Sequence, residues 1–250
     1  MQLGAQFYTI RDFCKDTDGL AESLKRVADI GYKTVQISGI CAYDAEWMKE
    51  ELRKNGLTCV LTHTPLDKIK GETEKVIADN KTLGLDLVGI GGYWGFKNGL
   101  TTIIDEFKDA VQKIKANGMR LTYHNHDHEF VKVDGKVILE HVSEFFGPDE
   151  MAFTLDTYWV QSGGADPVMW LNKFKGRTPC IHLKDMLFTA EKERRMAPVG
   201  EGNLNFDAIL KAAIDNGVKF ALVEQDNCYG EDPFDCLKRS YQYLKAQGLE

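Results

Sequence analysis

Five of the six histidines in this chain, together with several carboxylates, lie where short apolar runs end. Four such runs in succession close with His124, Asp156, His182 and Glu224. An unpaired polar group at the end of a buried run is costly, so a shared role is expected for these four. Two histidines and two carboxylates suit one divalent ion, such as Mn, Co, Zn or Mg, and the carboxylates would balance its charge.

Further candidates follow from the alternation of side chains along a strand. His126, Lys184 and Asp226 each lie two residues beyond a predicted ligand and should share its face. We interpret Glu224, His126 and Lys184 as groups that could move a proton. The residues expected to contact a substrate are Gln6, Tyr8, Arg11, His63, Trp159 and Asp226. A purely structural role is the alternative for each, for example an aspartate as a helix N-cap or Lys184 in a solvated turn.

A repeated unit must position these side chains. Helical segments end at a glycine, and an apolar run begins shortly after it, which is typical of helix termination before a strand. The predicted strands are Leu3–Tyr8, Lys33–Ile37, Leu57–Leu61, Leu87–Ile90, Met119–Tyr123, Met151–Leu155, Pro179–Leu183 and Lys219–Val223. Eight strand–helix units predict one (β/α)8 barrel over residues 1–250. An open sheet that binds a dinucleotide would be favoured by a G-x-G-x-x-G motif, which the sequence lacks.

The two longest connections also bear on the location of the site. Gly91–Gly99 and Lys184–Asn205 both follow a predicted strand. They should therefore lie on the C-terminal face of the barrel, where barrel enzymes keep their sites. We expect the candidate residues to meet in the mouth at that face.

Composition narrows the classes of partner. The formal net charge is -7, which disfavours binding to nucleic acid. No apolar run is long enough for a membrane span, and the first residues do not resemble a signal peptide. No cysteines form a C-x-x-C pair, so reduced thiols in a cytoplasmic protein are expected. The sequence leaves open whether the chain forms a homo-oligomer.

The candidate residues lie in segments that resemble a known family. The pattern is similar to the xylose isomerase-like TIM barrels, which include sugar phosphate isomerases/epimerases and are related to inosose dehydratase, ketose 3-epimerases and endonuclease IV. The segments that carry the resemblance are residues 4–12, 123–130, 155–157, 181–185, 200–202 and 222–224, in family order along almost the whole chain.

The resemblance implies a metal held by Glu, Asp, His and Glu from successive strands. Asp156, His182 and Glu224 match the last three ligands, whereas His124 stands where the first glutamate is expected. Either His124 replaces that ligand, or Glu129 reaches in from the following loop. Ketose 3-epimerases of this kind use two metal-bound glutamates as acid and base, and only Glu224 of that pair is present.

The leading hypothesis is a metal-dependent isomerase or epimerase of a sugar or sugar phosphate, working by proton abstraction next to a carbonyl through an enediolate. The alternative is a lyase or dehydratase on a keto-sugar or keto-cyclitol, in which the same enediolate expels a neighbouring oxygen. A nuclease like endonuclease IV ranks lower, because Trp159 stands where a further histidine ligand is expected. A non-catalytic sugar-binding barrel is a third class.

Overall fold

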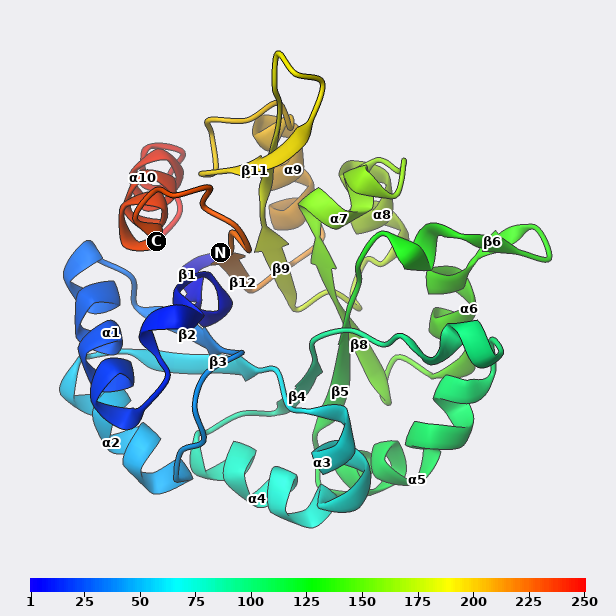
Figure 1. Ribbon diagram of the computed structural model, residues 1–250. Coiled ribbons are helices and arrows are strands. Elements are labelled where there is room, and N and C mark those ends of the chain that lie inside the picture. The colour runs from blue at the N-terminus through cyan, green and yellow to red at the C-terminus, as the bar shows by residue number, and fades with distance from the viewer.

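The computed structural model describes all residues from 1 to 250 and contains an eight-stranded parallel sheet. Its strands are β1 (Gln2–Gln6), β2 (Thr34–Ile37), β3 (Thr58–Thr62), β4 (Leu87–Ile90), β5 (Arg120–His124), β8 (Met151–Asp156), β9 (Cys180–Leu183) and β12 (Phe220–Val223). They pair in the order β3-β2-β1-β12-β9-β8-β5-β4 and curl into a ring surrounded by helices (Figure 1). The predicted (β/α)8 barrel is therefore confirmed, with a nearly closed wall.

The seam of the barrel lies between β3 and β4. A single parallel bridge joins His63 to Gly89 there, and the Thr64 amide donates to the Gly89 carbonyl at 2.9 Å. A Cβ on Gly89 would lie 2.0 Å from the carbonyl oxygen of Thr62. Only glycine allows this close approach without displacement of a backbone, so Gly89 lets the ring close.

Ten α-helices and three 3-10 helices connect the strands. The α-helices are α1 (Thr17–Ile30), α2 (Ala45–Lys54), α3 (Leu66–Gly71), α4 (Thr73–Thr82), α5 (Thr102–Ala116), α6 (Ile138–Phe145), α7 (Thr157–Ser162), α8 (Pro167–Lys173), α9 (Phe206–Asp215) and α10 (Pro233–Ala246). The 3-10 helices are η1 (Phe7–Phe13), η2 (Gly95–Asn98) and η3 (His128–Phe130). Several α-helices begin at an Asp or Asn whose side chain accepts an amide of the first turn, as Asp16 and Asp232 do.

One predicted strand is too long. We predicted Leu3–Tyr8, but β1 ends at Gln6 and η1 follows directly. The reason is local: the Gln6 side chain accepts a hydrogen bond from the Tyr8 amide and caps the 3-10 helix. Tyr8 therefore belongs to the rim of the mouth and not to the strand.

The alternation of side chains places the candidate residues inside the ring. On β9 and β12, Cys180 and Leu222 belong to a small apolar cluster, and His182 and Glu224 follow two residues later. The remaining members of this cluster are Val60, Leu61, Leu87 and Ala152. A larger core fills the space between the sheet and the helices. The apolar interior thus supports a polar layer at the carboxyl ends of the strands.

Two hairpins rise from loops at this end (Figure 1). β10 (Asp185–Phe188) and β11 (Arg194–Ala197) form an antiparallel pair within the long connection after β9. β6 (Lys132–Val133) and β7 (Lys136–Val137) form a second pair after β5. Among the helices, none combines the length and the apolar character needed to cross a membrane.

Candidate active site

Four ligand-type side chains converge at the carboxyl ends of four neighbouring strands. His124 ends β5, Asp156 ends β8, His182 lies on β9 and Glu224 follows β12. One ligand atom of each lies within 4.8 Å of the ligand atoms of the others. All four side chains are buried, with at most 3% of their surface exposed. Strands distant in sequence thus supply one compact donor set.

His124 and Asp156 each contact the surrounding backbone through one polar side-chain atom and direct the other polar atom toward the centre of the site. His124 Nδ1 lies 3.1 Å from the Gly91 carbonyl, which can only accept, so Nδ1 donates to the scaffold and Nε2 is the nitrogen that faces inward. Nε2 in turn lies 3.1 Å from Asp156 Oδ2. Asp156 Oδ1 accepts the Trp159 amide at 3.0 Å as the N-cap of α7. Oδ2 is the oxygen that faces the centre of the site.

His182 and Glu224 are arranged in the same way. His182 Nε2 lies 2.6 Å from Gln36 Oε1 on β2, and its Nδ1 lies 2.9 Å from Glu224 Oε2. Glu224 Oε1 accepts a hydrogen bond from Gln6 Nε2 at 2.8 Å. Gln36 and Gln6 therefore orient the two groups from behind, as residues around metal ligands commonly do.

This donor set fits a divalent cation. His182 Nδ1 and Glu224 Oε2 are buried and lie 2.9 Å apart, and the other close contact of Glu224 Oε2 is the Lys184 ammonium at 3.0 Å. The outer nitrogens of both histidines face fixed acceptors, so His124 Nε2 and His182 Nδ1 are the nitrogens that face the two carboxylate oxygens and are available to a cation. Imidazole nitrogens and carboxylate oxygens are ligands that Zn, Mn and Co accept.

Lys184 supplies a positive charge next to these four residues. Its ammonium lies 3.2 Å from Asp156 Oδ2, 3.0 Å from Glu224 Oε2 and 2.8 Å from Asp226 Oδ1. Burial lowers the pKa of Lys184, but the three carboxylates outweigh it and hold the pKa above its usual range. The side chain is 1% exposed, so a solvated turn is excluded for it. It is a charged acid rather than a base near neutral pH.

Its neighbour Asp185 has a structural role. The carboxylate accepts hydrogen bonds from the amides of Gly200, Gly202 and Leu204. It thereby ties the connection that follows the β10–β11 hairpin to the end of β9. This agrees with the structural alternative for a residue after a strand.

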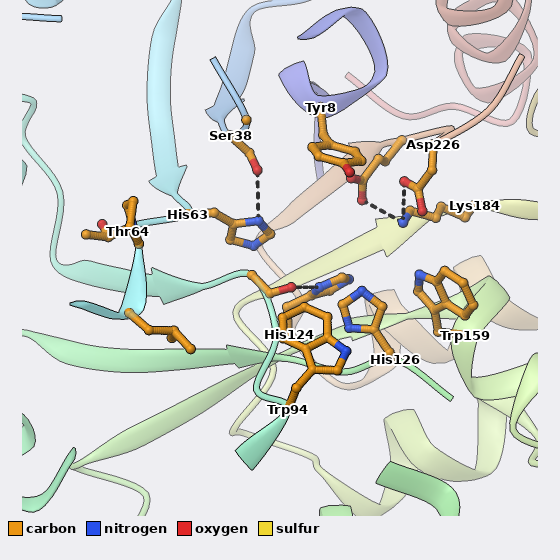
Figure 2. A pocket seen from close by; sticks show the side chains of 16 residues that line it. Tyr8, Ser38, His63, Thr64, Trp94, His124, His126, Trp159, Lys184 and Asp226 are labelled. Atoms are coloured by element: carbon orange, nitrogen blue, oxygen red, sulfur yellow. Dashed lines mark hydrogen bonds and ion pairs between the residues drawn. The ribbon is translucent and has the colours of Figure 1, made fainter. Parts of the chain in front are cut away.

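A cavity of about 460 Å³ includes His124 and Glu224 of the donor set in its lining (Figure 2). Trp94 and His126 lie on one side of it, Trp159 lies near Lys184, and Tyr8 stands at the rim. The His126 and Trp159 ring centres are 5.2 Å apart. Aromatic faces around a polar floor suit a ligand with both C–H faces and hydroxyl groups.

Two titratable groups in this cavity have shifted pKa values. Burial, assisted by the neighbouring His124 and Lys184, lowers the pKa of His126 to about 2. Burial raises the pKa of Asp226 to about 6. His126 is therefore a neutral imidazole, and its Nδ1 has no hydrogen-bond partner. It faces the same cavity as the charged Lys184.

The predicted substrate contacts separate into two groups. Tyr8, His63, Trp159 and Asp226 line the cavity. Gln6 lies behind Glu224, and Arg11 binds the carbonyls of Tyr8 and Asp226 while its guanidinium lies 4.1 Å from the centre of the Tyr8 ring. Neither Gln6 nor Arg11 lines the cavity.

Glu129, the alternative first ligand, lies outside the group of four. Its carboxylate accepts hydrogen bonds from the Tyr123 hydroxyl at 2.6 Å and the His126 amide at 2.8 Å. It is completely buried, and burial raises its pKa. In this arrangement Glu129 supports the segment that carries His126.

Two residues of the site were not predicted from the sequence, Gln36 and Ser38. Gln36 interrupts an apolar strand and was detectable as a buried polar residue. Ser38 lies 3.1 Å from His63 Nδ1 on a loop, where the sequence offers no periodic signal. Trp94, an aromatic residue that the sequence offered as a possible stacking surface for a sugar, lines the cavity and stacks on His128 at a ring-centre distance of 5.8 Å.

Comparison with known proteins supports the architecture. A family model described as xylose isomerase-like TIM barrel matches residues 24–246. An inosose dehydratase of Lacticaseibacillus casei is 24% identical over 164 residues, which cover 59% of this chain and 53% of that protein. This chain thus spans about half of the length of the curated relatives it matches.

Solved structures show the same fold. The structure of a sugar phosphate isomerase/epimerase from Parabacteroides distasonis superposes with a TM-score of 0.81 at 23% identity, covering 98% of this chain and 93% of that one. An L-ribulose 3-epimerase gives a TM-score of 0.73 at 14% identity, covering 98% of this chain and 94% of that one. At these identities the likeness concerns the fold alone.

Proposed function

Because this chain belongs to the xylose isomerase-like TIM barrel family, we propose that it is a metal-dependent enzyme that removes a proton next to a carbonyl of a sugar or keto-cyclitol. The observation that carries the proposal is the convergence of four buried ligand-type side chains, of which His124 and Glu224 line an aromatic-walled cavity. The names of relatives agree with it, since they include an epimerase and a dehydratase of such compounds.

The four convergent side chains would hold the ion, with His124 rather than Glu129 as the first ligand. Glu129 has both oxygens engaged by Tyr123 and His126, whereas His124 directs Nε2 at the centre. When bound, a divalent ion would supply Lewis acidity toward a carbonyl oxygen. Both oxygens of Glu224 face fixed partners, so we assign it to the ligand set and not to proton transfer.

His126 and Lys184 are the proposed acid and base. Two titratable groups whose environments separate their pKa values are a common acid–base arrangement. His126 is neutral and would accept the proton, and negative charge developing on the substrate would raise its pKa. Lys184 is charged and would stabilise or protonate a substrate oxygen.

The same proton abstraction can lead to two different reactions. Return of the proton to a carbon gives an isomerase or epimerase. Loss of a neighbouring oxygen gives a lyase. One observation supports this second candidate: Lys184 lines the cavity as a charged ammonium group that could donate a proton to the leaving oxygen. The missing second glutamate argues against the symmetric scheme of ketose 3-epimerases.

The test is exchange of the substrate proton with solvent. Protein loaded with Mn²⁺ would be incubated in D₂O with a panel of ketoses, aldoses and keto-cyclitols and followed by NMR. Deuterium at the carbon next to the carbonyl is expected, and loss of the adjacent hydroxyl or alkoxy group would identify the lyase branch. His126→Gln should abolish the exchange, whereas His141→Gln on α6, which lies outside the cavity, should not.

Three results would reject the proposal. Elemental analysis that finds no divalent ion after incubation with Mn, Co, Zn and Mg would remove the metal. Turnover of an α-deuterated substrate without a primary isotope effect in a single-turnover experiment would exclude proton abstraction and favour a hydride shift. Retained metal without turnover of any compound in the panel would favour a sugar-binding protein.

A further inference from the structure

The Lys184 ammonium contacts the same two oxygens that face the proposed metal position. These are Asp156 Oδ2 at 3.2 Å and Glu224 Oε2 at 3.0 Å. The other oxygen of each carboxylate is engaged elsewhere, by the Trp159 amide and by Gln6. A protein cation and a divalent ion must therefore share two carboxylate oxygens.

Asp226 is the third partner of the ammonium and makes its shortest contact, at 2.8 Å. Its carboxylate is not part of the convergent donor set. The backbone of Asp226 is held from two sides, because its carbonyl accepts a hydrogen bond from Arg11 at 3.0 Å and its amide lies 3.2 Å from Met196 Sδ. Asp226 is thus an anchored partner of Lys184 that does not itself face the proposed metal position.

We propose that the Lys184–Asp226 ion pair sets the affinity of the site for a divalent ion, with Lys184 weakening metal binding and Asp226 offsetting that effect. The inference rests on the metal site of the proposed function. It assigns Lys184 and Asp226 a positioning and charge-balancing role in addition to any contact with substrate.

The physical reason is the charge around the ion. Two ligand carboxylates and Asp226 are negative and Lys184 is positive, so the group as a whole can neutralise one divalent ion. Without Lys184 the two ligand oxygens are free of competition and the site gains one negative charge. Without Asp226 the ammonium has only the ligand oxygens as partners and competes more strongly for them. Removing both should return the net charge to that of the parent.

The size of the effect follows from Coulomb's law. The interaction between a unit charge and a divalent charge about 4 Å apart is strong enough to change a dissociation constant at least about tenfold even at the dielectric constant of water, and it is stronger in a buried site. We therefore expect Lys184→Met to lower the dissociation constant for Mn²⁺ at least about tenfold, and Asp226→Asn to raise it at least about tenfold. The double variant should lie within about threefold of the parent, since the opposing charges are then both removed.

The experiment is isothermal titration of the metal-free protein with MnCl₂ at pH 8, applied to the parent, both single variants and the double variant. Circular dichroism and thermal unfolding of each metal-free variant would verify the fold. Lys97→Met is the matched control, because Lys97 is an exposed lysine on the loop after β4 and its loss changes the net charge equally. It should leave the dissociation constant unchanged.

The outcomes separate the two proposals. A parent protein that binds no Mn²⁺ or other divalent ion overturns the metal site of the proposed function, and this inference with it. A parent that binds Mn²⁺, with a folded Lys184→Met variant that binds equally or more weakly, overturns the inference alone. Opposite shifts in the single variants that cancel in the double variant support it, because a merely structural role would weaken binding in all three.

Discussion

Replacement of Gln36 by leucine removes the group that orients His182 from behind. In the parent, Gln36 Oε1 and His182 Nε2 are 2.6 Å apart and both side chains are completely buried. This contact favours a proton on Nε2, so Nδ1, which lies 2.9 Å from Glu224 Oε2, is the nitrogen available to an ion. Leucine has a similar size but cannot accept a hydrogen bond.

The consequence should appear in metal affinity more than in the stability of the metal-free protein. Without the Gln36 acceptor, His182 can move its proton to Nδ1, where Glu224 accepts it, so the free energy of unfolding should fall by at most about 1 kcal/mol. The ion must then displace that proton and meets a ligand of lower basicity. Loss of such a supporting contact weakens metal binding by about 10- to 100-fold, or about 1.4–2.8 kcal/mol.

Calorimetric titration with Mn²⁺ measures the affinity, and urea denaturation of the metal-free protein measures the stability. Gln112→Leu is the matched control, since Gln112 is an exposed residue whose amide contacts Glu150 at 2.9 Å on the surface. It should change neither quantity appreciably. If Gln36→Leu binds Mn²⁺ as tightly as the parent, the assignment of His182 Nδ1 as a metal ligand oriented by Gln36 is wrong.

Four further outcomes are expected. Gly89→Ala should lower the free energy of unfolding in urea by about 1–3 kcal/mol, because the new Cβ would lie 2.0 Å from the Thr62 carbonyl, whereas Gly71→Ala meets no atom within 4 Å and should be nearly neutral. The pKa of His126 is lowered to about 2 in the fold, so the unfolded state takes up its proton first as the pH falls below ~6.5. The stability of the parent should then decrease more steeply between about pH 6 and 4 than that of His126→Gln, by up to ~1.4 kcal/mol per pH unit, and parallel curves would contradict the buried neutral imidazole. Mn²⁺ at about 100 times its dissociation constant should stabilise the fold by ~2.7 kcal/mol and raise the melting temperature by roughly 5–11 °C, while an unchanged temperature would exclude binding to the native state. Trp94→Ala removes one aromatic wall of the cavity and should raise the KM of a sugar substrate by about 3- to 10-fold with no change in metal affinity; a matching loss of metal would show that its role is structural.

The sequence by itself determined the architecture and the level of the barrel at which the polar residues lie. Glycines after helices indicate where the helices end, and continuous apolar runs indicate buried strands. Eight such strand–helix units are typical of a closed (β/α)8 barrel. The ends of parallel strands lie at one face of a barrel whatever the details of packing. The position of His124, Asp156, His182 and Glu224 at strand ends was therefore enough to predict that they meet, and their ligand atoms lie within 4.8 Å of one another.

The tertiary structure alone decided which ligand-type atoms face the centre of the site and which residues support the ligand side chains from behind. Gln36 and His182 are 146 residues apart in sequence and meet across the interior of the barrel, and Gln6 reaches Glu224 over 218 residues. Neither contact has a local signature, because the pairing depends on the curvature of the ring and on side-chain rotamers. The same holds for Lys184, for which the sequence favoured a solvated turn and a place in the site equally. Its three carboxylate partners come from β8 and from the segment after β12, and only the closed ring brings them to one ammonium.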